Sequence, residues 1–120
     1  MPIPARVLLT PEPPPKPHNG DVVRTMVEVG YIPADLVEVF LLRRQQGLDK
    51  YGTPLGPDGR NGGVDLAQEL VDACIYSYRL VLYAKTLRGR AFGREVLTHT
   101  LALLQVLVSD FDKDDFTDDV

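Results

Sequence analysis

Two pairs of carboxylates spaced three residues apart are the side chains in this sequence best suited to chemistry. Asp35 and Glu38 form the first pair, and Glu69 and Asp72 form the second. Residues three apart lie on the same face of a helix, so each pair would present two carboxylates together. Carboxylates gathered in a sheltered site repel each other unless a cation neutralises them, and Mg²⁺ or Mn²⁺ prefers such oxygen ligands. If two neighbouring helices bring these pairs together in such a site, all four residues are candidate ligands of a divalent metal.

Cationic residues near these acids suit a substrate that carries phosphates. Lys50 and Arg60 lie at the ends of a glycine-rich stretch, and a divalent metal can bridge phosphate oxygens while it activates water. Asn61 and backbone N–H groups of this stretch are further candidates for contacting phosphate. Arg79 shares a predicted helix face with the second acidic pair. We expect Lys50, Arg60 and Arg79 to bind substrate phosphates, and a role for Arg79 as counter-ion of the acids stays open.

The second acidic pair lies in an unusually apolar segment, which we expect to form a helix over about residues 64–88. Its polar side chains gather in a stripe of roughly 80° when successive residues are placed about 100° apart. The stripe consists of Asp65, Glu69, Asp72, Tyr76, Arg79 and Tyr83. Nearly every other position from Leu66 to Leu82 is apolar, which is typical of a buried helix. The acids are therefore expected in an interior or a cleft, where unpaired charge is costly.

The first acidic pair lies in another predicted helix, which runs from Pro33 to about Asp49. If the two helices form an antiparallel hairpin, their acidic faces can oppose each other, because the pairs differ in height by less than ~10 Å. Asp35 has an alternative role as a first-turn acid that the helix dipole favours. The expected metal ligands are therefore Asp35, Glu38, Glu69 and Asp72.

The residues around these pairs resemble a known family. The sequence DLVE at residues 35–38 is followed about thirty residues later by ELVD at residues 69–72, with LDKYGTPL between them and DLAQELVDACIY around the second pair. This pattern is similar to the ExxE…ExxD signature of the MazG-like all-α nucleoside triphosphate pyrophosphohydrolases. Over roughly residues 31–85 the chain most resembles the phage members of MazZ type, which act on dGTP in phages that replace adenine with 2-aminoadenine.

The resemblance implies hydrolysis of a (deoxy)nucleoside triphosphate, preferably dGTP or GTP, to the monophosphate and pyrophosphate. It implies that Glu38, Glu69 and Asp72 are catalytic metal ligands and that Lys50 contacts phosphate. Asp35 stands where the family signature usually has glutamate, and its shorter side chain would act through water. Family members are homodimers or homotetramers that assemble through helix packing. The alternatives are a dUTP- or dCTP-directed enzyme of the same superfamily and a non-enzymatic helical adaptor whose acidic stripes bind a basic partner.

The remaining sequence predicts an all-α protein, an antiparallel four-helix-type bundle that oligomerises through its helices. Residues 1–19 hold seven of the ten prolines and should form an extended arm, residues 20–109 the catalytic domain, and residues 110–120 a solvated acidic tail. Within the domain we expect a short helix over residues 22–30, with a strand as the alternative. We also expect a loop over residues 51–63, a glycine-rich break over residues 87–93, and a last helix to Ser109.

Composition narrows the possible partners. The net charge of −4 comes from the acidic tail. The sequence contains no basic patch with interleaved aromatic residues, so nucleic acid is a poor candidate partner. Apolar runs are too short to span a membrane. A single cysteine, Cys74, cannot form an internal disulfide and is expected to be a buried structural thiol. We therefore expect a cytoplasmic protein, in the host cytoplasm if a phage encodes it.

Overall fold

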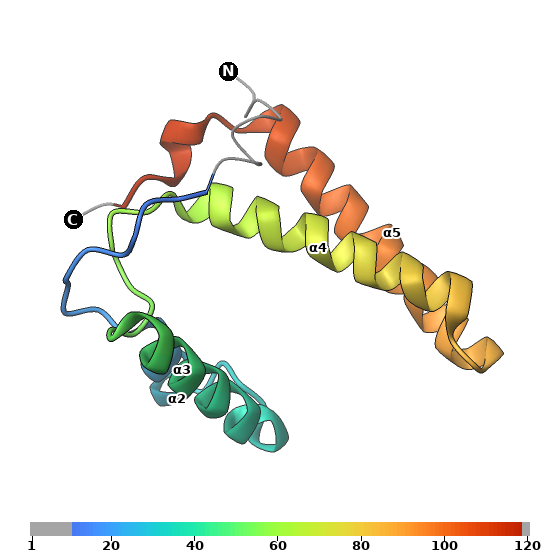
Figure 1. Ribbon diagram of the computed structural model, residues 1–120, viewed down its shortest axis with the longest axis horizontal. Helices are drawn as coiled ribbons and strands as arrows, with labels where there is room; N and C mark the ends of the chain where they lie inside the picture. Colours follow the sequence, from blue (N-terminus) through green and yellow to red (C-terminus); the bar gives the residue numbers. More distant parts are fainter. Residues whose placement is uncertain (1–10, 119–120) are drawn as a thin grey trace. The chain divides into compact units, whose positions relative to one another are not determined.

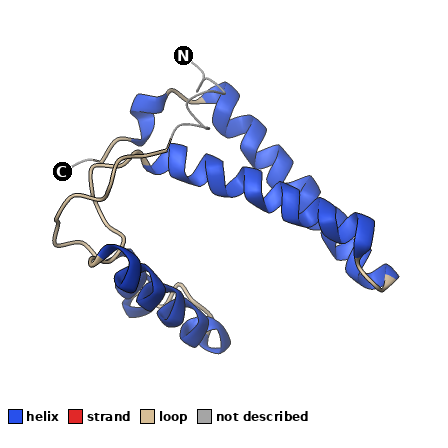
Figure 2. Ribbon diagram, in the orientation of Figure 1, coloured by secondary structure: helices blue, strands red, loops and turns tan. Residues whose placement is uncertain are grey.

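The computed structural model describes residues 11–118, and regular structure in this range is entirely helical (Figures 1 and 2). The elements are α2 (Val22–Glu28), the 3₁₀ helix η1 (Ala34–Leu36), α3 (Val37–Tyr51), α4 (Gly62–Tyr83), α5 (Leu87–Asp110) and the 3₁₀ helix η2 (Lys113–Phe116). The prediction of an all-α protein is confirmed, and the segment after Asp21 is a helix rather than a strand. None of the helices between residues 11 and 118 combines the length and apolar character needed to cross a membrane.

The chain divides into two compact units, which are described separately. Among the described residues, the N-terminal unit comprises residues 13–60 together with residue 118. The hairpin unit comprises residues 11–12 and 61–117. The predicted boundaries of the catalytic domain, at residues 20 and 109, stay a prediction. Much of the predicted arm, residues 1–10, lies outside the described residues.

In the hairpin unit, α4 and α5 pack against each other in antiparallel directions (Figure 1). Ala67 near the start of α4 forms a buried cluster with Leu107 near the end of α5. Further along α4, the Cys74 thiol donates a hydrogen bond to the Thr100 hydroxyl at 3.3 Å. Contacts therefore pair later residues of α4 with earlier residues of α5. Cys74 is half-buried rather than buried, and its hydrogen bond places it beside α5.

The predicted helix break over residues 87–93 is wrong, because this segment is the beginning of α5. The turn consists of residues 84–86, and the Thr86 side chain caps α5 by accepting a hydrogen bond from the Gly89 N–H at 3.0 Å. Gly93 serves close packing instead: a Cβ there would lie 2.8 Å from the Ser77 carbonyl oxygen and 2.7 Å from the Leu80 Cβ. Glycine at this position therefore brings the two helix backbones together.

The acidic segment after α5 is folded onto the hairpin, which corrects the prediction of a solvated tail for its first part. Asp112 and Asp115 form a capping box around η2. The half-buried Phe116 packs against the hairpin core, and its ring fills the space that a Cβ at Gly63 would need. The rings of Phe111 and Phe116 contact each other in a tilted arrangement, with centroids 5.2 Å apart and an interplanar angle of 48°. Two phenylalanines within the acidic segment therefore supply the apolar contacts that hold it.

The N-terminal unit joins α2 to α3 through an ion pair. Asp21 caps α2 by accepting a hydrogen bond from the Arg24 N–H at 3.1 Å. Its carboxylate also accepts hydrogen bonds from the Arg44 guanidinium on α3, the shortest at 2.7 Å. The hydrogen bond from Arg44 lowers the pKa of the Asp21 carboxyl below 3.8, and a backbone hydrogen bond from Arg24 adds to this. The single acid therefore fixes both the start of α2 and its position on α3.

Candidate functional site

The second acidic pair lies on the face of α4 that points away from α5. Asn61 caps this helix by accepting a hydrogen bond from the Val64 N–H, so α4 begins at Gly62. Ala67 marks the side that packs on α5. Glu69 and Asp72 lie roughly 140–160° around the helix from Ala67, at about 100° per residue, and both side chains are exposed. The predicted carboxylate stripe is therefore present on a face that the hairpin unit itself leaves open.

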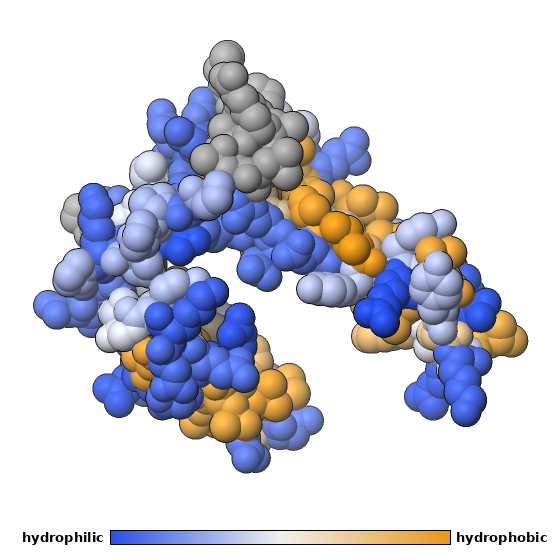
Figure 3. Space-filling view, in the orientation of Figure 1, coloured by the Kyte–Doolittle hydropathy of each residue, from blue (hydrophilic) through white to orange (hydrophobic). Residues whose placement is uncertain are grey.

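Large apolar side chains flank this stripe on both sides. Leu66, Ile75 and Leu82 are about half exposed, and Tyr76 and Tyr83, within the stripe, are 67% and 75% exposed. In Figure 3, apolar residues follow the hairpin helices at the surface. The sequence predicts α4 to be buried on most sides, whereas these side chains of α4 are exposed in the single chain. These apolar side chains therefore lie at the surface of the hairpin unit, beside the carboxylates.

The first acidic pair occupies the equivalent position in the N-terminal unit. Asp35 lies in η1 and Glu38 in the first turn of α3, and both are exposed. Arg44 marks the side of α3 that faces α2, and Glu38 lies roughly 120° from it around the helix. Val39 and Leu42 beside the pair are each 59% exposed. This pair too lies on a face that its own unit leaves open and that exposed apolar residues flank.

The three predicted phosphate ligands divide between the units. The ammonium group of Lys50 lies 5.1 Å from the centroid of the neighbouring Tyr51 ring, at the exposed end of α3. Arg60 is half-buried in the loop before α4, where its N–H donates to the Asp58 carboxylate at 3.1 Å. Arg79 is exposed on the acidic face of α4. Lys50 and Arg60 therefore belong to the N-terminal unit, and Arg79 belongs to the hairpin unit.

The acidic residues fit a divalent cation as partial ligand sets. Within either unit, the described residues form no group of three or more histidine, cysteine, aspartate or glutamate side chains arranged to hold a metal. Each unit instead contributes one exposed pair of carboxylates on one helix face. Mg²⁺ is commonly held by one or two carboxylates together with water and substrate phosphates, so a pair of hard oxygen ligands suits it. The donor chemistry of both pairs is therefore compatible with Mg²⁺ or Mn²⁺.

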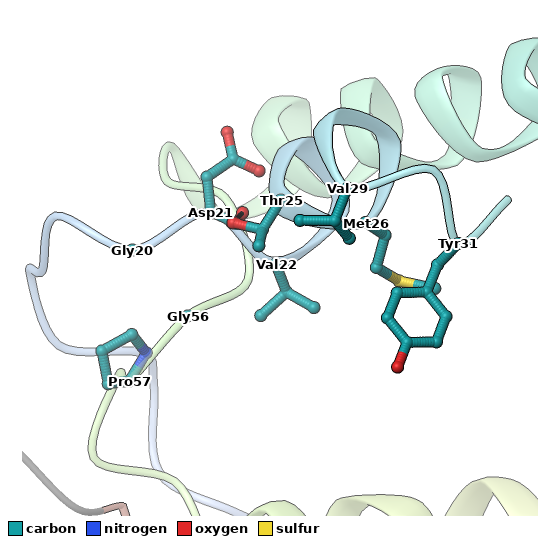
Figure 4. Close-up of a pocket in the computed structure, with 9 residues that line it drawn as sticks. All are labelled: Gly20, Asp21, Val22, Thr25, Met26, Val29, Tyr31, Gly56 and Pro57. Atoms are coloured by element: carbon teal, nitrogen blue, oxygen red, sulfur yellow. Dashed lines mark hydrogen bonds between the residues drawn. The ribbon is translucent and has the colours of Figure 1, made fainter.

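The N-terminal unit also contains an open apolar hollow of about 390 Å³, shown in Figure 4. Side chains of α2 line one side together with Val29 and Tyr31, which come after this helix, and the loop before α4 lines the other. The lining residues are Gly20, Asp21, Val22, Thr25, Met26, Val29, Tyr31, Gly56 and Pro57. Because the Asp21 carboxylate is bound to Arg44, the hollow offers an apolar surface rather than a charged one.

Two contacts of the loop over residues 52–61 were missed by sequence reasoning. The Asp58 carboxylate is buried, with 4% of the residue exposed, and organises the turn by accepting the Arg60 N–H. Lys16 donates its backbone N–H to the Asp58 carbonyl oxygen at 2.7 Å, which ties the proline-rich segment to the loop. The proline–aspartate–glycine pattern around Asp58 is a local signal for the turn. The contact with Lys16 has no local signal, because it joins segments that are distant in sequence.

Comparisons with protein-family models, with curated proteins and with solved structures found no match to this chain.

Proposed function

We propose that the protein hydrolyses a (deoxy)nucleoside triphosphate to the monophosphate and pyrophosphate with the help of Mg²⁺ or Mn²⁺. One observation carries the proposal: both acidic pairs lie on helix faces that their own units leave open, each beside exposed apolar side chains. Covering such a face removes its carboxylates from water, which is unfavourable unless a cation compensates them. A divalent ion bound to substrate phosphates meets this need.

In the proposed mechanism, Glu38, Glu69 and Asp72 would hold the metal, and Asp35 would act through water. The metal would supply Lewis-acid activation of water and of the phosphate oxygens. Lys50 and Arg60 neutralise the phosphates that leave, since charge-assisted hydrogen bonds to developing negative charge favour the transition state. Arg79, exposed on the same face as Glu69 and Asp72, neutralises the carboxylates or contacts phosphate.

The preferred substrate is dGTP or GTP, and this preference rests on the resemblance to MazZ-type enzymes alone. A dUTP- or dCTP-directed enzyme would use the same metal and phosphate chemistry. Comparing the hydrolysis of each NTP and dNTP would therefore establish the base specificity.

We further propose that the chain assembles as a homodimer or homotetramer through the open faces of the hairpin unit, completing a helical bundle. Exposed apolar side chains on α4 and α5 support this. Tyr76, Tyr83 and Phe92 are 61–75% exposed, and three rings of about 200 Å² each would present roughly 400 Å² of surface. A stable interface buries about 800 Å² per partner, so these rings alone supply half of it. The occupant we propose is a second copy of this chain.

The test of the catalytic proposal is to incubate the full chain with each NTP and dNTP and either Mg²⁺ or Mn²⁺, and to identify the products. We expect pyrophosphate, rather than orthophosphate, from one or a few nucleotides. Glu69→Gln and Asp72→Asn should each abolish turnover while the helical circular dichroism is retained. Glu95→Gln, a matched change of an exposed acid on α5, should leave turnover intact.

Two outcomes contradict the proposal. Release of orthophosphate would indicate cleavage at another phosphate bond. Absence of turnover on every nucleotide, with a melting temperature that Mn²⁺ does not change, would favour the adaptor, because a metal that binds the native state stabilises it.

A further inference from the structure

The turn at Gly59 in the N-terminal unit presents a backbone N–H group to an anion. Gly59 has a φ of +81°, a conformation that favours glycine. Its N–H donates to a carboxylate oxygen of Asp118, from the acidic tail, at 3.4 Å. The following N–H, of Arg60, points to the buried Asp58 carboxylate. The tail therefore contributes an anionic group at this turn, and its hydrogen bond is longer than the usual 2.7–3.2 Å.

A lysine side chain lies over the same glycine. The backbone N–H of Lys16 is bonded to the Asp58 carbonyl oxygen, which anchors Lys16 beside the turn. A Cβ at Gly59 would lie 2.8 Å from the Lys16 Cδ and 3.2 Å from its Cε. The absence of a side chain at Gly59 thus lets the lysine cross the turn. Among residues 11–118, no ion pair holds the Lys16 ammonium group.

We propose that the Gly59 turn and Lys16 form a binding site for the phosphate groups of a polyphosphate, and that Asp118 occupies this site as a tethered competitor. A phosphate has several strong acceptor oxygens, so it can accept from the Gly59 N–H and the Lys16 ammonium group together, whereas the single long contact of Asp118 uses one of them. A polyphosphate also carries more negative charge than one carboxylate. It therefore gains more from Lys16 and displaces the tail.

This inference rests on the proposed function for the identity of the ligand, which would be the triphosphate of the nucleotide. It adds to that function a phosphate ligand outside the resembling segment and a regulatory role for the tail. Because Asp118 belongs to the same chain, its local concentration at the turn is high and independent of protein concentration. Removal of its charge should therefore tighten polyphosphate binding.

The test measures binding of inorganic pyrophosphate to the full chain by isothermal titration calorimetry, with and without Mg²⁺. Lys16→Gln should weaken binding by roughly three- to ten-fold, the size expected for one partly exposed charge contact, while Lys16→Arg should keep most of the affinity. Asp118→Asn should tighten binding by about two- to five-fold. Matched charge changes elsewhere, Lys85→Gln and Asp110→Asn, should leave the affinity within two-fold of the wild type (about 0.4 kcal/mol).

Three outcomes would overturn the inference: a wild-type chain that does not bind pyrophosphate, a Lys16→Gln variant that binds as the wild type does, or an Asp118→Asn variant with unchanged or weaker binding. Thermal melting of each variant shows whether it is folded, and Asp118→Asn changes no contact of the folded core. The two proposals can fail separately. Lys16-dependent pyrophosphate binding without nucleotide hydrolysis would retain the site and refute the hydrolase. Nucleotide hydrolysis by a chain whose pyrophosphate binding Lys16→Gln does not change would refute only the site.

Discussion

Replacing Gly93 with alanine should destabilise the protein, although alanine favours helices. A Cβ at this position would lie less than 3.0 Å from the Ser77 carbonyl oxygen and the Leu80 Cβ, so the backbones of α4 and α5 would have to move apart. Overpacking of this kind costs about 1–3 kcal/mol. The gain in helix propensity is about 1 kcal/mol, so we expect a net loss of roughly 1 kcal/mol.

Gly47 provides the matched control, because it lies inside α3 and a Cβ added there would meet nothing within 4 Å. Gly47→Ala should therefore stabilise the protein by about 0.5–1 kcal/mol. Urea denaturation followed by circular dichroism would measure both variants, and the two changes should have opposite signs. If Gly93→Ala were as stabilising as Gly47→Ala, the register between α4 and α5 would be wrong. The conclusion that Glu69 and Asp72 face away from α5 would fall with it.

Three further predictions test other contacts. Asp21→Asn should lower the free energy of unfolding by about 1–2 kcal/mol at neutral pH. Because the pKa of Asp21 is lower in the folded than in the unfolded state, its stabilising contribution is present above pH 3.8 and is lost as the pH falls through the pKa of the folded state. Melting curves of the wild type and the variant should therefore converge in acid. Phe116→Ala should cost about 2 kcal/mol by removing the ring that packs beside Gly63, and chemical denaturation would measure this loss. Leu103→Glu, at a leucine 59% exposed on α5, should dissociate the proposed oligomer in sedimentation velocity; an unchanged molecular mass would exclude this face.

Local sequence patterns predicted most of the helices because their end signals act over one turn. The helix expected from residue 22 begins there, capped by Asp21, and Gly52, with a φ of +74°, ends α3 near the predicted position. The glycines in residues 87–93 led to the wrong prediction of a helix break. A glycine in a sequence suggests a break both where it bends the chain and where it allows a second helix to pack closely. What distinguishes the two is the approach of Ser77 from the other helix, which no local pattern contains.

The candidate site was predictable to the extent that it follows helix periodicity. Three-residue spacing and apolar surroundings indicated that Glu69 and Asp72 share one face of α4, and the structure places both on its open side. Lys16 was not predictable, because its position depends on a backbone hydrogen bond to Asp58 across distant segments. The many aspartates around Phe116 led to the prediction of a solvated tail, whereas its aromatic ring packs on the hairpin core.

The open faces of the two units connect the proposed chemistry with the proposed assembly. Burial of apolar surface contributes about 25 cal/mol per Å², so the exposed tyrosines and leucines beside the stripe of α4 favour covering it. Covering the stripe also desolvates Glu69 and Asp72, at a cost of several kcal/mol per uncompensated ion. Without a cation, the gain from burying apolar surface and the cost of desolvating the carboxylates oppose each other. A bound divalent ion removes the cost of desolvating Glu69 and Asp72. The two equilibria are linked: the metal should strengthen association of the stripe face with a second copy by the same factor by which that association strengthens metal binding.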